Sequence, residues 1–160
     1  MRIHIGAVGR LKKSPEYVLA DDYVGRVKKF GRTAGITGIA VKEYPESQAA
    51  TAQLRKSDEA DRLLAGCPPH STIIILDEHG SDMSSSRLAK HIGRLRDDGI
   101  QDLAFLIGGP DGHGPALLDS AATKISFGSM TWPHRLVRIM LAEQIYRAVT
   151  ILLNHPYHRS

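Results

Sequence analysis

Apolar and polar residues alternate along the chain with two different periods, and the change of period separates strand-like from helix-like segments. The stretch "RIHIGAV" at residues 2–8 repeats every second residue, as a strand with one polar face does. The run "STIIILD" at residues 71–77 has no polar alternation, which is typical of a strand buried on both faces. Helix-like segments have apolar residues three and four apart, and the first begins with Ser14 as N-cap and Pro15 at the first helical position. We therefore predict strands at residues 2–8, 36–44, 71–77, 103–107 and 124–127, and helices at 14–31, 47–66, 84–98, 115–122 and 134–153.

Strands and helices in regular alternation predict an α/β fold around a mostly parallel sheet of five or six strands. No linker-like composition or internal repeat interrupts the chain, so residues 1–160 are expected to form a single domain. Open sheets of this class bind ligands at the carboxyl ends of their strands. Two loops, at residues 107–115 and 127–134, directly follow predicted strands, and we expect them to meet at that edge of the sheet.

The last predicted helix, at residues 134–153, is apolar on more than one face. A helix that is hydrophobic on most sides needs a second surface to pack against, beyond the sheet. The simplest such surface is the same helix of another copy, which predicts a two-fold homodimer. The apolar residues that lead to this expectation are Leu136, Val137, Ile139, Met140, Leu141, Ile145, Val149, Ile151 and Leu152.

The first loop, "IGGPDGHGP" at residues 107–115, holds four glycines and two prolines. Its glycine spacing fits neither the dinucleotide fingerprint G-x-G-x-x-G nor the phosphate loop G-x-x-x-x-G-K-[ST], and Asp111 would repel a phosphate. A tight turn without a ligand would need only one or two glycines for its positive φ angles. The composition therefore favours a fixed loop whose backbone a ligand other than phosphate approaches closely.

The second loop, "FGSMTWPH" at residues 127–134, combines small and apolar residues and leads into the last helix. Its backbone groups are candidates to bind a heterocycle, and Phe127, Met130 and Trp132 are candidates for the walls of an apolar pocket. In the alternative interpretation, Met130 and Trp132 fill the core.

Charge is unevenly distributed along the chain, whose formal net charge is +4. Residues 1–32 hold eight Lys or Arg and three Asp or Glu, and residues 133–160 hold four Arg and one Glu. These two ends are expected to offer a positive surface to RNA or DNA, although Lys28 and Lys29 alone also fit a solvated helix face. No apolar run approaches the roughly 20 residues that cross a bilayer, the start does not resemble a secretory signal, and Cys67 is the only cysteine. We therefore expect a soluble cytoplasmic protein.

The end of the chain, "NHPYHR", concentrates His155, Tyr157, His158 and Arg159. A metal site is not expected there, because Pro156 denies the two histidines a common helical face and no Cys/His spacing pattern is present. Glu143 and Arg147, four residues apart in the last helix, would on spacing alone be a surface ion pair.

Four stretches together resemble one family: "IIILDEHG" (73–80), "FLIGGPDGHGP" (105–115), "SFGSMTWPHRLVRIMLAEQIYRA" (126–148) and "NHPYHR" (154–159). They are similar to the RlmH family, the small ribosomal-RNA pseudouridine N3-methyltransferases of the SPOUT superfamily. The resemblance extends over the whole chain in size and in the order of elements. The second loop departs from the family pattern at Phe127, Gly128 and Trp132, and the first 70 residues match by pattern only.

The resemblance implies a SPOUT-type α/β fold with a trefoil knot in its C-terminal part, a homodimer, and S-adenosylmethionine as methyl donor. Such knots are rare exceptions to general topology rules, and periodicity alone does not predict one. In the family, the donor is held largely by backbone groups of three loops. Matched residue by residue, donor binding is implied for Leu76, Gly108, Phe127, Gly128, Ser129, Met130, Thr131 and Trp132.

The implied reaction is methylation of N3 of a pseudouridine in 23S rRNA of the assembled ribosome. Since the N3 proton is weakly acidic, a group must help to remove it or stabilise the anion, or alignment of donor and acceptor must supply much of the rate. We expect residues from the tail of the partner subunit to complete the site, with Tyr157 or His158 near this proton. Arg159, Arg147 and His134 are expected to bind phosphate or developing charge. A transfer-RNA methyltransferase of the same superfamily and a non-catalytic ribosome-associated module are the alternatives.

Overall fold

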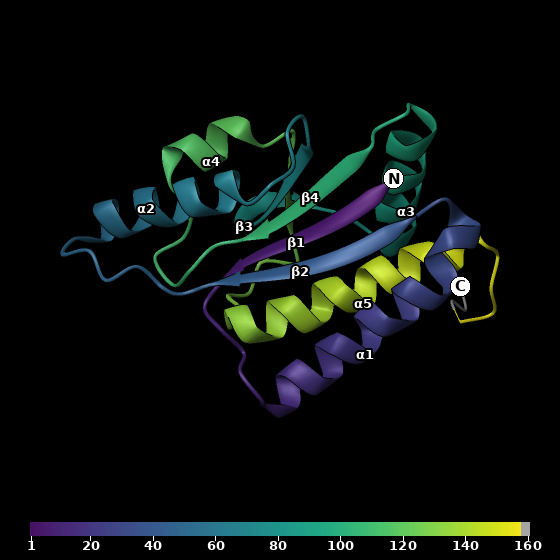
Figure 1. Cartoon of the computed structure of the whole chain (residues 1–160), viewed down its shortest axis with the longest axis horizontal. Helices are drawn as coiled ribbons and strands as arrows, with labels where there is room; N and C mark the ends of the chain where they lie inside the picture. Colours follow the sequence, from purple (N-terminus) through teal and green to yellow (C-terminus); the bar gives the residue numbers. More distant parts are fainter. Residues whose placement is uncertain (158–160) are drawn as a thin grey trace.

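A five-stranded sheet forms the centre of the computed structural model, which describes residues 1–157 (Figure 1). Its strands lie in the order β2-β1-β4-β3-β5, and every neighbouring pair is parallel. This confirms the predicted parallel sheet with five strands. The strand order does not test the trefoil knot, which stays a prediction. The strands are β1 (Arg2–Val8), β2 (Gly38–Tyr44), β3 (Thr72–Asp82), β4 (Asp102–Ile107) and β5 (Thr123–Ser126).

Helices cover both faces of the sheet. The larger core contains residues of α1, α3 and α5, and the smaller core on the other face contains residues of α2 and α4. Figure 1 shows α2 and α4 above the sheet, and α1 and α5 side by side below it. Because each helix follows a parallel strand, the loops that lead into the helices gather at the carboxyl edge of the sheet. The helices are α1 (Pro15–Phe30), α2 (Ala52–Ala65), α3 (Ser85–Asp97), α4 (Pro115–Ser120) and α5 (His134–Leu152), with a 3-10 turn at Gly31–Ala34.

Two element boundaries differ from the prediction by five residues. Helix α2 begins at Ala52 with Thr51 as its N-cap, five residues later than expected. Ser47 is engaged elsewhere, because its N–H donates to Glu59 Oε1 at 2.8 Å and its hydroxyl donates to a carboxylate oxygen of Asp58. Strand β3 continues to Asp82 because it pairs with β5 again after an irregularity that follows Leu76. Ser14 does cap α1, as predicted: its hydroxyl accepts from the Tyr17 N–H at 3.3 Å.

Helix α5 is covered on two flanks within the chain. Tyr146 packs against Tyr23 of α1 with 6.2 Å between the ring centroids, and Gln144 accepts a hydrogen bond from Ser85 of α3 at 2.7 Å. The interpretation that the apolar faces of this helix require a second copy is therefore wrong for most of its length. Among the large apolar residues of α5, only Leu136 in its first half is fully exposed, at 40 %. The homodimer stays a prediction.

Candidate functional site

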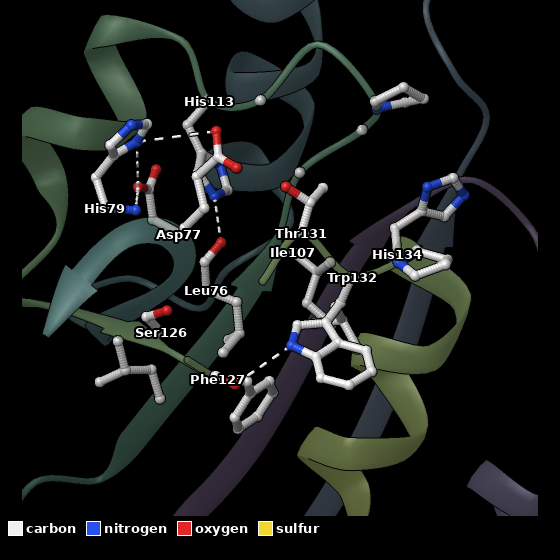
Figure 2. Close-up of a pocket in the computed structure, with 18 of the residues that line it drawn as sticks. Leu76, Asp77, His79, Ile107, His113, Ser126, Phe127, Thr131, Trp132 and His134 are labelled. Atoms are coloured by element: carbon white, nitrogen blue, oxygen red, sulfur yellow. Dashed lines mark hydrogen bonds and ion pairs between the residues drawn. The ribbon is translucent and has the colours of Figure 1, made fainter. Parts of the chain in front are cut away.

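A hollow of about 630 Å³ opens at the carboxyl edge of the sheet. Three segments supply most of its lining: residues 76–79 at the end of the regular part of β3, residues 107–113 at and after the end of β4, and residues from the end of β5 to His134. Figure 2 shows His79 and Asp77 on one side of this pocket and Trp132 and His134 on the other. The two loops singled out in the sequence therefore meet at the predicted edge.

The pocket brings together most of the residues for which the family resemblance implies donor binding. Seven of the eight line it, and Ser129 is not among the lining residues. The alternative in which Met130 and Trp132 fill the core is wrong, because these side chains are 69 % and 39 % exposed. The seven lining residues are Leu76, Gly108, Phe127, Gly128, Met130, Thr131 and Trp132.

The second loop is held by hydrogen bonds within itself. The Ser126 hydroxyl donates to the Gly128 carbonyl at 2.8 Å and accepts from the Gly128 N–H at 3.2 Å. Gly128 has a φ of 107°, which residues with a side chain rarely adopt. The Trp132 indole N–H donates to the Phe127 carbonyl at 3.3 Å. These bonds, all within residues 126–132, help to hold the loop at one wall of the pocket.

The first loop is folded as a tight turn and also forms a pocket wall. The Gly112 N–H donates to the Gly109 carbonyl at 3.0 Å, and Gly112 has a φ of 86°. Asp111 is paired with Arg55, whose Nε lies 2.6 Å from its carboxylate, and this hydrogen bond holds the pKa of Asp111 below its usual value. Because Arg55 compensates the charge, Asp111 is a weaker argument against phosphate than the sequence suggested. The glycine spacing still argues against a phosphate loop.

His113 is a pocket residue that the sequence analysis missed. Its side chain is buried, and its Nε2 donates to the Leu76 carbonyl at 2.7 Å. Nδ1 is buried and has no hydrogen-bond partner among residues 1–157. In the sequence, His113 lies within "DGHGP", but the prediction for this loop was based on its glycines.

Asp77, Glu78 and His79 also line the pocket and were not predicted. The carboxylate of Asp77 accepts the His79 backbone N–H at 2.8 Å, so the chain turns directly after the buried part of β3. His79 itself is 86 % exposed. Two carboxylates at this wall suit a ligand that carries positive charge. In the sequence, these pocket residues could have been found from the two acids, Asp77 and Glu78, that directly follow the apolar run of a buried strand.

His134 begins α5 at the rim of the pocket. Burial, and next the nearby guanidinium of Arg138, hold the pKa of His134 below its ordinary value of 6.5. Arg138 is itself buried, and it donates to Glu43 at 2.7 Å and to the carbonyls of Val8 and Gly9. The imidazole is therefore a neutral group at pH 7, held beside the end of β1.

Arg147 and Tyr157 lie together at the other end of α5 and do not line the pocket. Both contact Glu143: Arg147 Nε donates to Oε1 at 2.8 Å, and the Tyr157 hydroxyl donates to the same oxygen at 3.3 Å. The Tyr157 ring packs on Tyr146, with 4.7 Å between the ring centroids. Burial is the main cause that raises the pKa of Tyr157 to about 12. His158 and Arg159, the other predicted tail residues, lie outside the described residues.

Residues 1–157 contain no group of three or more His, Cys, Asp or Glu that could hold a metal ion. Among the helices in this part of the chain, none has the length and apolar character needed to span a membrane.

Comparisons with known proteins show one family. The family described as "Predicted SPOUT methyltransferase" matches residues 1–158. The ribosomal RNA large subunit methyltransferase H of Brucella anthropi is 48 % identical over 160 residues, which cover all of both chains. The protein with this name in Nitrobacter winogradskyi is 48 % identical over 159 residues, 99 % of each chain. The SpoU methyltransferase AviRb of Streptomyces viridochromogenes, solved with its cofactor AdoMet, gives a TM-score of 0.40 at 13 % identity, over 96 % of this chain and 61 % of that one.

Proposed function

The chain belongs to the SPOUT methyltransferase family, and from this premise we propose that it is an S-adenosylmethionine-dependent methyltransferase of large-subunit ribosomal RNA. The acceptor atom is N3 of a pseudouridine in the assembled ribosome, and residues 1–160 act as a single domain in the cytoplasm. The observation that carries the proposal is the pocket at the carboxyl edge, because seven residues matched to donor binding on sequence alone line one hollow.

The pocket suits the donor in size and in chemistry. Its volume of about 630 Å³ lies within the range of small-molecule sites. Leu76, Ile125 and Phe127 offer apolar contact, and the two glycine-containing loops offer backbone N–H and carbonyl groups. Asp77 and Glu78 stand where a positively charged ligand gains from them. When bound, the donor supplies an activated methyl group, and the residues of the chain position it and exclude water.

His134 is the residue of the described chain best placed to meet the acceptor base. It stands at the rim of the pocket and is neutral at pH 7, so it is suited to accept a hydrogen bond or a proton. Because a neutral imidazole does not bind phosphate by charge, contact with the acceptor base is the role we expect for His134. Tyr157, with its pKa of about 12, stays protonated and is a hydrogen-bond donor rather than a base. His158 and Arg159 remain candidates for contact with the N3 proton and with RNA phosphate.

The two ends of α5 require a second copy if Tyr157 is to act at the pocket. Tyr157 is held on Glu143 and Tyr146, which follow His134 by nine and twelve residues of helix, or about 14 and 18 Å along the axis. Tyr157 therefore does not line the pocket of its own chain, and in a homodimer the partner supplies the tail. The exposed apolar residues Met130 and Trp132 line the pocket, and Leu136 is exposed in the first turn of α5, where a partner would cover them. This location replaces the whole helix as the expected contact surface.

Ribosomal RNA is expected to approach the same edge of the sheet. Arg10, Lys12 and Lys13 are exposed on the segment between β1 and α1, which begins at the carboxyl end of β1. Lys and Arg bind the phosphate backbone, and that binding weakens as salt concentration rises. Methyl transfer at fixed substrate concentration should accordingly decline with added salt.

The test is transfer of labelled methyl groups from S-adenosylmethionine to ribosomes, with free ribosomal RNA and transfer RNA as parallel substrates. We expect transfer to ribosomes, and mapping of the modified nucleotide to a pseudouridine methylated at N3. Modification of transfer RNA instead would reassign the substrate. Calorimetry with S-adenosylmethionine provides the second readout. An absence of binding would contradict the methyltransferase function and favour a non-catalytic ribosome-associated module.

A further inference from the structure

His113 is a buried polar side chain at the back of the pocket. It is 9 % exposed, and its Nε2 lies 2.7 Å from the Leu76 carbonyl oxygen (Figure 2). A carbonyl oxygen only accepts hydrogen bonds, so Nε2 must carry a proton. The bond joins the loop after β4 to the end of the regular part of β3, and thus joins two walls of the pocket.

The same ring also supports Gly108. A Cβ atom on Gly108 would lie 2.9 Å from both Cε1 and Nδ1 of His113, closer than van der Waals contact allows. The imidazole therefore fills the space beside this glycine, and only a residue without a side chain fits there. His113 therefore contacts both Leu76 and Gly108, two residues that were matched to donor binding.

The hydrogen bond falls where the ladder of β3 stops. Pairing with β4 ends at Leu76 and Ile107, and pairing with β5 is interrupted after Leu76 until Ser81. A buried carbonyl without a partner costs free energy. An apolar side chain would fill the space of His113 without leaving Nδ1 unpaired. The feature that histidine adds is therefore the N–H at Leu76.

We propose that His113 is a positioning residue of the methyl-donor site. It holds the Leu76 carbonyl with Nε2 and supports Gly108 with its ring, so that the wall from β3 and the wall from the first loop keep their separation before the donor binds. The inference rests on the proposed function for the identity of the donor. A preformed pocket binds more tightly because binding does not have to order it. His113 does not reach the acceptor base, so it acts on donor affinity rather than on the transfer step.

Two substitutions separate the hydrogen bond from simple polarity. In His113→Gln, the amide nitrogen is as many bonds from Cα as Nε2 of histidine, so it can donate to the Leu76 carbonyl. In His113→Asn, the amide is one bond shorter and stops at the level of Nδ1. We expect Gln to keep the Kd for S-adenosylmethionine within about threefold of wild type, and Asn to weaken it by about tenfold. The kcat at saturating donor should stay within about twofold in both variants.

Calorimetric titration of each full-length variant with S-adenosylmethionine measures the affinity, at a temperature well below the Tm of each variant. His70→Asn is the matched control, because His70 is exposed in a turn outside the pocket and its φ of 62° suits asparagine. Equal affinities of the Gln and Asn variants would overturn the role of His113, as would a fall in kcat with an unchanged KM for the donor. Wild-type protein that does not bind S-adenosylmethionine would instead overturn the proposed function.

Discussion

The two ends of α5 carry residues that the family resemblance assigns to one site, but their surroundings differ. At the first end, His134 borders an open hollow, and the side chains beside it, such as Trp132 and Leu136, remain exposed. At the second end, Arg147 and Tyr157 share Glu143, and the Arg147 guanidinium lies over the Tyr157 ring, so their polar groups already have partners. The first end is arranged to receive a ligand, and the second is arranged to hold the tail in a fixed place. Residues that the resemblance assigns to one site are therefore not close together within one chain, because the rigid helix α5 separates His134 from Arg147 and Tyr157.

The largest effect should come from removing the tail. A chain truncated after Leu153 keeps every described pocket residue, so its Kd for S-adenosylmethionine should change by only a few fold. The rate of methyl transfer to ribosomes should fall by roughly 100-fold or more, the usual contribution of groups that assist proton transfer. Single-turnover transfer of labelled methyl groups measures this rate.

Mixing provides the control for this truncation. The truncated chain retains an intact pocket, and a full-length His134→Ala chain retains an intact tail. If the site is shared between two copies, mixed dimers of these two impaired proteins should recover activity that neither has alone. Recovery would place tail and pocket on different subunits, and a failure of mixed dimers to recover would show that the tail does not serve the partner's pocket.

The order and type of the strands and helices were predictable from the sequence, because interactions between residues close in sequence largely determine them. Apolar periodicity located all five strands, and the N-caps Ser14 and Ser84 lie where hydroxyl side chains precede helical runs. The start of α2 was wrong because Ser47, a good N-cap by type, is bound by Glu59 from within the helix itself. Periodicity contains no information on such a contact between residues twelve positions apart.

The candidate site was predictable where a motif is continuous, and less so where it depends on packing. Seven residues for which the resemblance implies donor binding lie in two loops and one strand end, and they line one pocket. His113 was missed because its role depends on the Leu76 carbonyl, which lies 37 positions earlier in the chain. The packing of α1 and α3 against α5 was missed for the same reason. Helical periodicity shows that a face is apolar, but it does not show which elements bury that face.

A smaller effect should follow from loosening the first end of α5. Arg138 is buried and joins the helix to the carbonyls of Val8 and Gly9 and to Glu43. Arg138→Met leaves these acceptors without a donor, so the free energy of unfolding should drop by about 3 kcal/mol. Urea denaturation measures the change. Arg135→Met is the control: Arg135 is half exposed and its nearest carboxylate, Glu16, is 3.8 Å away, so its loss should cost less than about 0.5 kcal/mol.

The smallest effect concerns the charge of His134. Its pKa lies below 6.5, chiefly through burial and secondarily through Arg138, while Glu46 acts in the opposite direction. For a group whose folded pKa is lowered, stability is present above the unfolded value and is lost as pH falls through the folded value. Stability from this group should therefore persist from pH 8 down to about 6.5, the ordinary histidine pKa, and decline below it. Activity that needs a neutral imidazole should persist further, down to the lower pKa of the folded state.

Neutralising Glu46 tests this sign directly. Glu46 Oε1 and His134 Nε2 would each lie 3.4 Å from a Cβ on Gly9, so the two groups face the same small space. Glu46→Gln removes a negative charge that favours the protonated ring, and the pKa of His134 should fall further, with the acid limb of activity moving to lower pH by a fraction of a unit. NMR titration of the His134 ring protons measures the pKa without relying on activity. Asp98→Asn, an exposed change at the end of α3 on the opposite edge of the sheet, should leave it unchanged. An unchanged or raised pKa of His134 in Glu46→Gln would mean that these two groups do not interact as the structure places them.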